Sequence, residues 1–413
     1  MSSIEKEIRL KINDNDIERI KKVTDSYKER TRLIDITCGK YEFDSLSKLG
    51  YIGRIRCNGN SYKIEIKNYQ NKDECLEKSL PINSIRDGLD FFKLLNMEPY
   101  LVLDRYREEG VKLIPIENHN NIEELRKNPN SEFANMKQNI IIGVRKTHKF
   151  VPNHKVSDFL VPYTSSGCIA MCMYCYLVCN YNKCSYLRIF VNREEMLDKI
   201  IKVANQSDKE LTFEIGSNSD LILENTITHN LEWTIENFNA DKGYLTFPTK
   251  FDMVDPLLNL RNKEKIIIRM SMNPEEIINR VEFGTSRLEE RIKAINKLKE
   301  AGYKVGILIA PIILVDNWEE LYEELIKKLS EELSEEIKND AVFELIFMTY
   351  SYVHKMINKE AFPNAINLFN PEIMTGRGRG KYMYKKETRE KGEEFLRKTM
   401  KKYLPNSEIL YIV

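Results

Sequence analysis

The residues best placed to do chemistry are three cysteines at C-x3-C-x2-C spacing: Cys168, Cys172 and Cys175. Three thiolates so close along the chain can bind one metal ion or one metal cluster. Soft thiolate ligands with no histidine among them favour an iron–sulfur cluster over a hard cation. A cube of four irons held by three protein ligands leaves one iron free for a cofactor. The spacing therefore predicts a [4Fe-4S] cluster with an open coordination site.

A structural zinc ion is the alternative interpretation of these cysteines. Structural zinc takes four ligands, and Cys179 and Cys184, just past the triplet, could complete that set. Three ordinary buried cysteines are a further alternative. Spacing alone leaves these alternatives open.

The amino-acid sequence around the three cysteines resembles that of one protein family. Residues 144–147, 172–177 and 186–192 are similar to spore photoproduct lyase, the radical S-adenosylmethionine (SAM) enzyme that splits a thymine dimer in DNA. The resemblance spans roughly residues 130 to 413 and continues, in the family's order, through Phe213-Glu214, Ser219-Asp220, Thr249–Phe251, Ser271–Glu276, Gly284–Ser286, Ala301–Tyr303, Ile309–Ile312 and Gly380–Tyr384.

The resemblance implies a [4Fe-4S] cluster that cleaves SAM reductively to a 5′-deoxyadenosyl radical, which abstracts hydrogen from a nucleic acid base. It also implies a reductant such as flavodoxin or ferredoxin. Three residues match positions that hold SAM, namely Ser219, Lys250 and Ser271. Each serine could instead be a helix cap, because serine after a strand is commonly one.

Two tyrosines flank the last cysteine of the triplet. Tyr174 and Tyr176 match tyrosines of the hydrogen-atom relay that regenerates SAM in the family. Their alternative role is packing in the shell around a cluster.

Ser217 departs from the family pattern. The family has a cysteine there that gives a hydrogen atom to the product radical. A serine hydroxyl cannot do this, because its O–H bond is much stronger than a thiol S–H bond. Cys179 and Cys184 are candidates for the missing donor, with a redox pair or simple burial as alternatives.

We therefore expect a lyase-like radical SAM enzyme that acts on a nucleic acid base, by thymine-dimer repair or related base chemistry. The alternative is modification of a small nucleotide or peptide that the N-terminal domain recruits. A non-catalytic cluster protein that binds nucleic acid is the third hypothesis. The intact triplet and the matches to SAM positions count against it.

The elements that position these residues follow from the hydrophobic pattern after residue 140. Apolar runs at 211–215, 244–247, 266–270, 305–309 and 343–347 alternate with amphipathic helices. Continuous apolar runs are typical of parallel strands covered on both faces. Ser286 and Glu289 predict a capping box that opens a helix, and Gly302 closes it. The resemblance makes this α/β domain a partial (β/α)6 barrel, whose site lies at the C-terminal strand ends.

Length and composition predict two domains. The chain has 413 residues, 64 of them basic and 63 acidic, so its net charge does not indicate any class of binding partner. The N-terminus reaches charged residues before any apolar run, which speaks against a signal peptide. The longest apolar run, 305–315, is too short to cross a membrane. Eight cysteines without a targeting segment indicate a reducing compartment, so we expect a cytoplasmic protein with no membrane partner.

Residues 1–116 show strand-like alternation with charged residues on one face. This predicts a smaller α+β, mostly antiparallel domain that resembles a truncated CYTH triphosphate tunnel. The resemblance implies that a metal or phosphates are held by Glu5, Glu7, Arg54, Arg56, Lys63 and Lys67. A docking module and a solvated sheet are the alternatives. Asparagine-rich residues 117–139 predict a linker, and residues 140–413 form the second domain.

The C-terminal region is basic. Residues 375–403 contain glycines that would let basic and aromatic groups approach a nucleic acid backbone, around Arg377, Arg379, Lys381 and Tyr382. Attraction to phosphates is one interpretation. A solvated terminal helix is the other.

Overall fold

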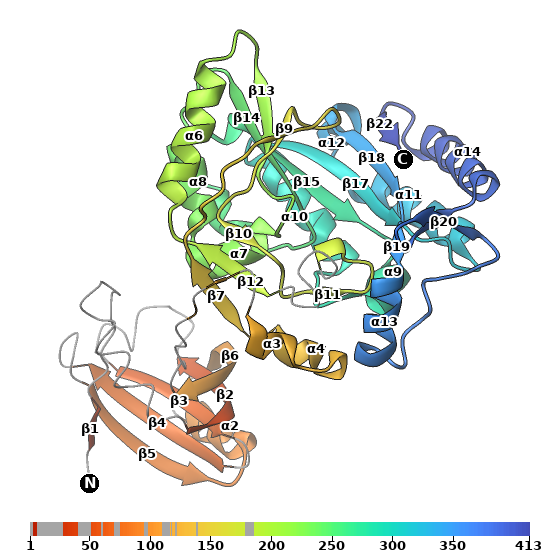
Figure 1. Ribbon diagram of the computed structural model, residues 1–413. Helices are drawn as coiled ribbons and strands as arrows, with labels where there is room; N and C mark the ends of the chain where they lie inside the picture. Colours follow the sequence, from red (N-terminus) through yellow and green to blue (C-terminus); the bar gives the residue numbers. More distant parts are fainter. Residues whose placement is uncertain are drawn as a thin grey trace. The chain divides into compact units, whose positions relative to one another are not determined.

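The computed structural model describes residues 3–5, 28–39, 51–58, 61–69, 75–94, 98–109, 116, 118–119, 122–137, 139–177 and 186–413. The chain forms two compact units, Met1–Ile116 and Glu117–Val413 (Figure 1). Within the described parts, no helix is both long and apolar enough to cross a bilayer.

The first unit is an antiparallel sheet with one helix. Its strands occur in the order β1-β5-β4-β3-β2-β6. Their bounds are Ser3–Glu5, Cys75–Ile82, Ser61–Tyr69, Tyr51–Asn58, Lys28–Gly39 and Glu98–Glu109. Helix α2 (Ile85–Leu94) packs on one face, where Ile55, Ile64 and Phe92 are buried. An alternating sequence produces such a sheet because successive side chains point to opposite faces.

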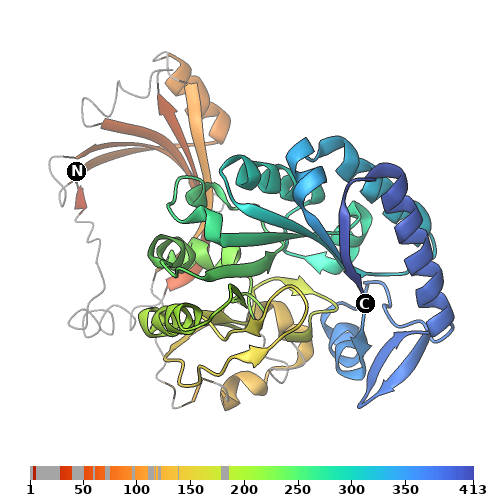
Figure 2. The same ribbon diagram turned by 90° about the horizontal axis from the view of Figure 1, so that it is seen from above.

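The second unit is built on an eight-stranded sheet that curls into a half-barrel, seen from above in Figure 2. Its order is β22 (Glu408–Ile412), β18 (Val342–Phe347), β17 (Lys304–Ile312), β15 (Ile266–Met272), β14 (Gly243–Thr249), β13 (Leu211–Glu214), β9 (Phe159–Leu160) and β8 (Val151–Pro152). Strands β9 to β22 are parallel, and β8 is antiparallel to β9. The parallel order predicted from the apolar runs is confirmed.

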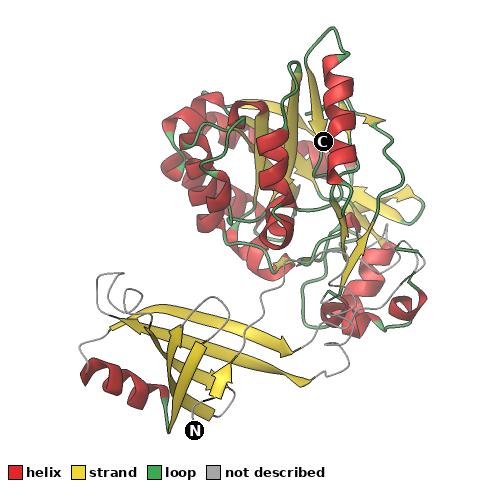
Figure 3. Ribbon diagram, turned by 90° about the vertical axis from the view of Figure 1, so that its left-hand side faces the viewer, coloured by secondary structure: helices red, strands yellow, loops and turns green. Residues whose placement is uncertain are grey.

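Helices cover the outer side of this sheet, as Figure 3 shows. They are α6 (Arg193–Asn205), α7 (Leu221–Thr228), α8 (Asn230–Asn237), α9 (Glu275–Val281), α10 (Leu288–Glu300), α11 (Trp318–Glu332), α12 (Glu335–Asp340) and α14 (Lys386–Tyr403). Short 3-10 turns, η2 (Asp255–Leu257) and η3 (Lys263–Lys265), lie in the connections after β14. Burial of the apolar strand faces against these helices forms one continuous core.

All five predicted strands are present, each within three residues of its predicted ends. The sheet has eight strands, more than the expected six, because β8 and β9 at one side and β22 at the other also join it. Strand β9 has two residues, too few for periodicity to reveal.

The capping box of α10 lies one residue later than predicted. Arg287 is the N-cap, and Glu290 Oε2 accepts from the Arg287 amide at 2.8 Å. Ser286 is engaged elsewhere, since its hydroxyl donates to Asp252 Oδ1 at 2.5 Å and accepts from the Asp252 amide. The predicted helix end is correct, because Gly302 has φ +98° just past the C-cap.

Three smaller sheets accompany the half-barrel. The first contains β10 (Ser165–Ser166), β12 (Leu187–Phe190) and β7 (Ile140–Gly143). The second pairs β11 (Met171–Cys172) with β16 (Glu282–Phe283), and the third contains β19 (Tyr350–Ser351), β21 (Lys381–Tyr384) and β20 (Met374–Gly378). Helix α13 (Tyr352–Ala361) follows β19. The segment expected as a linker carries α3 (Glu123–Arg126), η1 (Asn130–Glu132) and α4 (Phe133–Met136), and Phe133 packs against Ile357 of α13.

Candidate active site

The three cysteines lie on one loop that is tied to two neighbouring segments. Gly167, with φ +85°, forms a parallel bridge to Ser219 and donates its amide to Asn218 O at 2.8 Å. Further on, Cys172 pairs with Glu282 in the antiparallel pair of β11 and β16. The Cys175 amide then donates to Cys172 O at 3.1 Å, which closes a turn between the last two cysteines.

All three thiols are free and partly buried. The pKa of Cys168 is raised to about 12, chiefly by burial and also by the neighbouring Asp220, while Lys137 opposes the shift. Burial also raises the pKa of Cys172 well above its usual value, followed by the charge of Glu282. A soft metal that replaces the protons would therefore relieve a cost that the bare thiolates carry.

Among the described residues, no group of three or more Cys, His, Asp or Glu side chains is arranged to hold one metal ion. A four-iron cube takes each thiolate on a separate iron, so its ligands stand farther apart than those of one zinc ion. The other half of the alternative zinc set, Cys179 and Cys184, lies outside the described residues.

Lys137, which sequence reasoning missed, lies beneath this loop. Its Nζ donates to Cys168 O at 2.6 Å, and the residue is 8% exposed. Burial lowers the pKa of Lys137, whereas the thiols of Cys168, Cys175 and Cys172 raise it. A positive charge at this point favours an anionic group on the cysteines, as a cluster held by three thiolates would be.

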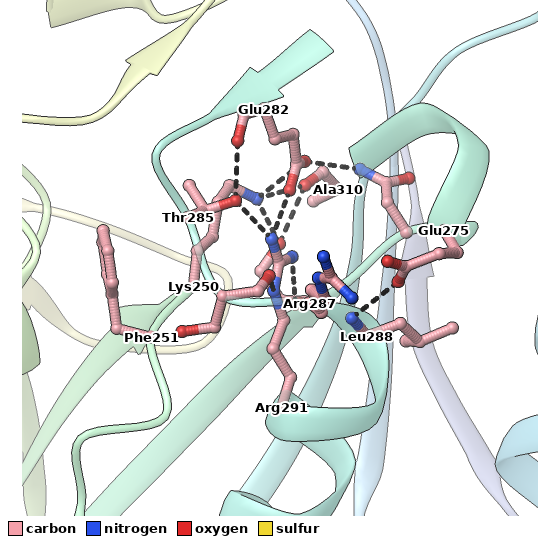
Figure 4. Close-up of polar contacts among 12 residues, drawn as sticks. Lys250, Phe251, Glu275, Glu282, Thr285, Arg287, Leu288, Arg291 and Ala310 are labelled. Carbon is pink, nitrogen blue, oxygen red and sulfur yellow. Dashed lines mark hydrogen bonds and ion pairs between the residues drawn. The ribbon is translucent and has the colours of Figure 1, made fainter. Parts of the chain in front are cut away.

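Glu282 is the hub of a buried polar network (Figure 4). Its carboxylate, fully buried, accepts from Arg291 Nη2 at 2.7 Å and from Asn273 Nδ2 at 2.8 Å. The Tyr174 hydroxyl also donates to it, and Lys250 Nζ lies 3.4 Å away. Burial alone would raise the pKa of Glu282, but the charges of Lys250 and Arg291 hold it at about 2. Glu282 is therefore an anion that ties the cysteine loop to the barrel.

Arg291 joins this network to α10. Its Nη1 donates to Ser271 O and its Nε to Ser286 O, both at 2.9 Å, while Nη2 also donates to Thr285 Oγ1. Sequence reasoning missed Arg291 and Glu282. A signal was present, because Arg291 falls on the apolar face of α10, three residues after Leu288 and four before Ile295.

Two of the predicted SAM-binding residues meet at the C-terminal ends of β14 and β15. Lys250 Nζ donates to Ser271 Oγ and, at 2.9 Å, to Ala310 O at the end of β17. Ser271 is 3% exposed and its hydroxyl donates to Ala310 O at 2.9 Å. The Lys250 ammonium also lies 5.7 Å from the centre of the Tyr174 ring, on the side of the cysteine loop.

Ser219, the third predicted SAM-binding residue, lies where the loop after β13 meets the cysteine loop. Its hydroxyl accepts from Ser165 Oγ at 2.8 Å, and the residue is buried. The adjacent Asp220 caps α7 and accepts from Thr249 Oγ1 and from the Lys250 amide, both at 2.9 Å. The structure therefore brings Ser219, Lys250 and Ser271 to one rim of the half-barrel, as the strand ends predict.

The two tyrosines of the cysteine loop differ in environment. Tyr174 is turned inward to Glu282, and burial together with that carboxylate raises its pKa well above the usual value. Tyr176 is 50% exposed. Only Tyr174 therefore belongs to the buried network, although the two tyrosines are separated by a single cysteine.

Ser217 occupies the loop between β13 and α7, half-buried, next to Asn218 and Ser219. The preceding Gly216 allows this loop to run close to β14, because a Cβ there would lie 2.6 Å from Phe247 Cβ. The position of Ser217 is therefore fixed beside the segment that contacts the cysteine loop. The alternative donors Cys179 and Cys184 fall outside the described residues.

The basic C-terminal residues form a hairpin of β20 and β21. Arg377, Arg379 and Lys381 are exposed, and Gly378, Arg379 and Gly380 all have positive φ at its turn. Tyr382 instead packs on Phe369, with ring centres 4.5 Å apart. The hairpin therefore presents cations to solvent over an aromatic base.

In the first unit, three of the basic residues predicted to bind phosphate form ion pairs with Glu65. The fully buried carboxylate pairs with Arg54 Nε at 2.6 Å, Lys63 Nζ at 2.6 Å and Arg56 Nη1 at 3.3 Å. Sequence reasoning missed Glu65. Of the other predicted residues, Glu7 and the side chains of Glu5 and Lys67 lie outside the described set.

Comparisons with known proteins agree with one another. The family model for spore photoproduct lyase matches residues 97–413. The chain is 34% identical over 315 residues to spore photoproduct lyase of Bacillus subtilis (strain 168), covering 75% of this chain and 92% of that protein. It is 30% identical to that of Geobacillus sp. (strain Y412MC61), with the same shares of the two chains.

Solved structures give the same result. A spore photoproduct lyase complexed with dinucleoside spore photoproduct matches with a TM-score of 0.67 and 29% identity over 72% of this chain and 89% of that chain. A mutant with bound AdoMet and dinucleoside spore photoproduct matches with a TM-score of 0.64 and 30% identity over 73% and 88%.

Proposed function

Because this chain belongs to the spore photoproduct lyase family, we propose that it is a radical SAM enzyme of DNA repair that reverses the thymine dimer known as spore photoproduct. The observation that carries this proposal is the meeting of the cysteine loop with Ser219, Lys250 and Ser271 at one rim of the half-barrel. The similar structure with bound AdoMet and dinucleoside spore photoproduct supports both the cofactor and the substrate.

Cys168, Cys172 and Cys175 would hold the [4Fe-4S] cluster, and Lys137 would offset its negative charge. When bound and reduced, the cluster supplies the electron that cleaves SAM to a 5′-deoxyadenosyl radical. Lys250, Ser271 and Ser219 would hold SAM at the rim of the half-barrel, where the ammonium of Lys250 could bind a carboxylate. Glu282 holds Lys250 in place through an ion pair at 3.4 Å. We also propose that the electron comes from flavodoxin or ferredoxin and that the protein works in the cytoplasm.

The last step, transfer of a hydrogen atom to the product radical, must differ from that expected for the family. Ser217 cannot give up a hydrogen atom to a carbon radical, because its O–H bond is too strong. We therefore assign the final hydrogen transfer to another group, with Cys179, Cys184 and the Tyr174–Tyr176 pair as candidates. Tyr176 is the exposed member of that pair, so it is the tyrosine that substrate or solvent can reach.

The hairpin of β20 and β21 is the proposed nucleic acid contact. Arg377, Arg379 and Lys381 are exposed cations on a turn whose glycines leave the backbone uncovered. Such groups bind phosphates without regard to sequence and do so less strongly as salt rises. This fits an enzyme that must find one lesion in any DNA sequence.

For the first unit we propose a second function, binding of a polyphosphate in the manner of a CYTH-like domain. The supporting observation is that Arg54, Arg56 and Lys63 converge on the single carboxylate of Glu65. Titration calorimetry with inorganic triphosphate should show binding that weakens when Arg54 and Arg56 become Ala. Absence of binding heat in the parent protein would remove this second function without affecting the first.

The main proposal is tested by measuring 5′-deoxyadenosine release from the anaerobic, reconstituted protein across a panel of substrates. Dinucleoside spore photoproduct and ultraviolet-irradiated spore-type DNA should stimulate release above that with undamaged DNA. Nucleoside triphosphates and peptides are the comparison. Stimulation by a triphosphate or a peptide alone would replace dimer repair with modification of a small molecule.

A further inference from the structure

Helix α13 lies against the cysteine loop, and two of its side chains contact the loop's backbone. His354 Nε2 is 2.9 Å from Cys175 O, and Asn358 Nδ2 donates to Met173 O at 2.7 Å. Side chains four residues apart share one helix face. Both are nearly buried, at 6% and 8% exposure. The loop is therefore held at two of its carbonyl groups by one helix face.

Each of these carbonyls belongs to a peptide group that leads directly into a tyrosine. The Met173 carbonyl shares a rigid plane with the Tyr174 amide, and the Cys175 carbonyl shares one with the Tyr176 amide. A hydrogen bond to each carbonyl therefore fixes the orientation of the backbone that carries the tyrosine. Glu282 holds Tyr174 at its far end, through the hydroxyl.

The hydrogen-bond roles at His354 follow from its partners. A carbonyl can only accept, so Nε2 must carry the ring proton in this contact. Nδ1 then accepts from the Ser351 hydroxyl, 3.1 Å away, while Ser351 Oγ accepts from the His354 amide as the N-cap of α13. Burial lowers the pKa of His354, which agrees with the neutral ring that this pattern requires.

The same helix is joined to the basic hairpin. In the pair of β19 and β21, Ser351 lies opposite Lys381 and Tyr350 opposite Tyr382. The Tyr352 amide donates to Gly380 O at 2.8 Å, within the hairpin turn.

Tyr350 completes the link between the hairpin strand and the helix face. Its ring stacks on His354, with centres 5.3 Å apart, and its hydroxyl accepts from Asn358 Nδ2 at 2.9 Å. A continuous set of contacts thus runs from the hairpin turn to the cysteine loop.

We propose that α13 is a clamp that couples the hairpin to the cysteine loop, with His354 and Asn358 as the positioning residues for Tyr174 and Tyr176. DNA that engages the hairpin tightens the clamp and so steadies the two tyrosines when substrate is present. The proposal that α13 holds the cysteine loop depends only on the contacts of α13. The proposal that DNA strengthens this hold depends also on the proposed function. Coupling of this kind requires that a ligand favour the clamped state over the open one.

The clamp is tested by hydrogen–deuterium exchange of residues 168–177 in the full-length, cluster-loaded protein. His354→Phe keeps an aromatic ring but removes the donor to Cys175 O, and Asn358→Leu removes the donor to Met173 O. Each should speed amide exchange in this segment by about fivefold, the effect of one lost hydrogen bond. His354→Gln, whose amide can still donate to Cys175 O, should restore the slow exchange.

Lys359→Ala is the matched control, because Lys359 is an exposed residue of the same helix. Exchange in strands β15 and β17 reports whether each variant remains folded. Unchanged exchange of residues 168–177 in both donor variants would overturn the clamp. Equal acceleration in Lys359→Ala would do the same, since the effect would then follow from any change in α13.

The coupling is tested by adding an undamaged duplex oligonucleotide, with binding followed in the same samples by fluorescence anisotropy. Bound DNA should slow exchange of residues 168–177 in the parent protein and leave it unchanged in His354→Phe. Binding without added protection in the parent would overturn the coupling. If the parent does not bind the duplex at all, both the DNA substrate and the coupling are wrong, while the clamp is still decided by the variants.

Discussion

Cys172 and Glu282 lie directly opposite each other in the short antiparallel pair of β11 and β16. The pairing places a buried anion beside a cluster-ligand position, and the same anion holds Tyr174, Lys250 and Arg291. Chain segments more than a hundred residues apart are thereby fixed around one carboxylate. Glu282 thereby holds both Lys250 and Tyr174 beside the cysteine loop.

The Glu282–Arg291 pair should be a large contributor to the stability of the second unit. Both side chains are fully buried, so Arg291→Met leaves a buried carboxylate without its closest cationic partner. We expect a loss of about 3 to 5 kcal/mol in the free energy of unfolding, measured by urea denaturation of the apoprotein. The exposed pair Lys293–Glu289 on the same helix is the control, and Lys293→Met should leave the free energy of unfolding essentially unchanged, because solvent screens an exposed ion pair. Equal losses in the two variants would contradict the role given to Glu282.

Replacing any one of Cys168, Cys172 and Cys175 with Ala should abolish both iron incorporation and reductive SAM cleavage. The three thiols are the only ligand set that the loop offers to the cluster in the described chain. Cys57→Ala, at a buried cysteine of the first unit, is the control and should retain both. Iron content and 5′-deoxyadenosine are the measurements. Zinc in place of iron after anaerobic reconstitution, or SAM cleavage in the triple variant, would overturn the assignment.

Glu65 predicts how the first unit responds to acid. Burial alone would raise its pKa, but Lys63, Arg54 and Arg56 lower it below the usual 4.5. Because the folded-state pKa is lowered, this carboxylate stabilises the fold above about pH 4.5 and loses that contribution as the pH falls through its folded value. Exchange protection at β3 and β4 of the full chain, measured relative to the intrinsic amide rate at each pH, should fall below pH 4.5 in the parent protein. In Glu65→Gln this protection should already be low at pH 7, with little further change in acid. A parent-like pH profile of protection in that variant would refute the assignment.

Arg377→Ala and Arg379→Ala should weaken DNA binding to damaged and undamaged duplexes alike, since a phosphate contact carries no sequence information. Each lost contact should reduce the slope of log affinity against log salt by about 1. Lys386→Ala is a suitable control, because Lys386 lies on α14, outside the hairpin, and is equally exposed. An unchanged salt slope in both hairpin variants would exclude the hairpin from the interface.

The sequence predicts the barrel strands well because continuous apolar runs leave few alternatives for buried parallel strands. It also places Lys250 and Ser271 at the ends of neighbouring strands, where the structure has them. Glu282, Lys137, His354 and Asn358 could not be predicted, since their partners are distant in sequence; Tyr174 and Glu282 are 108 residues apart. Only the folded chain shows that a glutamate after α9 faces a tyrosine in the cysteine loop.

The central claim is that this chain repairs spore photoproduct although Ser217 stands where the family's hydrogen-donating cysteine is expected. The most direct measurement is the yield of repaired thymine from dinucleoside spore photoproduct under anaerobic, reducing conditions, for the parent protein and Ser217→Cys. Repair by both is expected. If Cys179 or Cys184 donates the hydrogen, the parent gives clean product and Ala at that position produces adducts; if neither does, Ser217→Cys raises the clean yield. Failure of both proteins to convert the dimer, while another substrate stimulates 5′-deoxyadenosine release, would contradict the assignment of this protein to dimer repair.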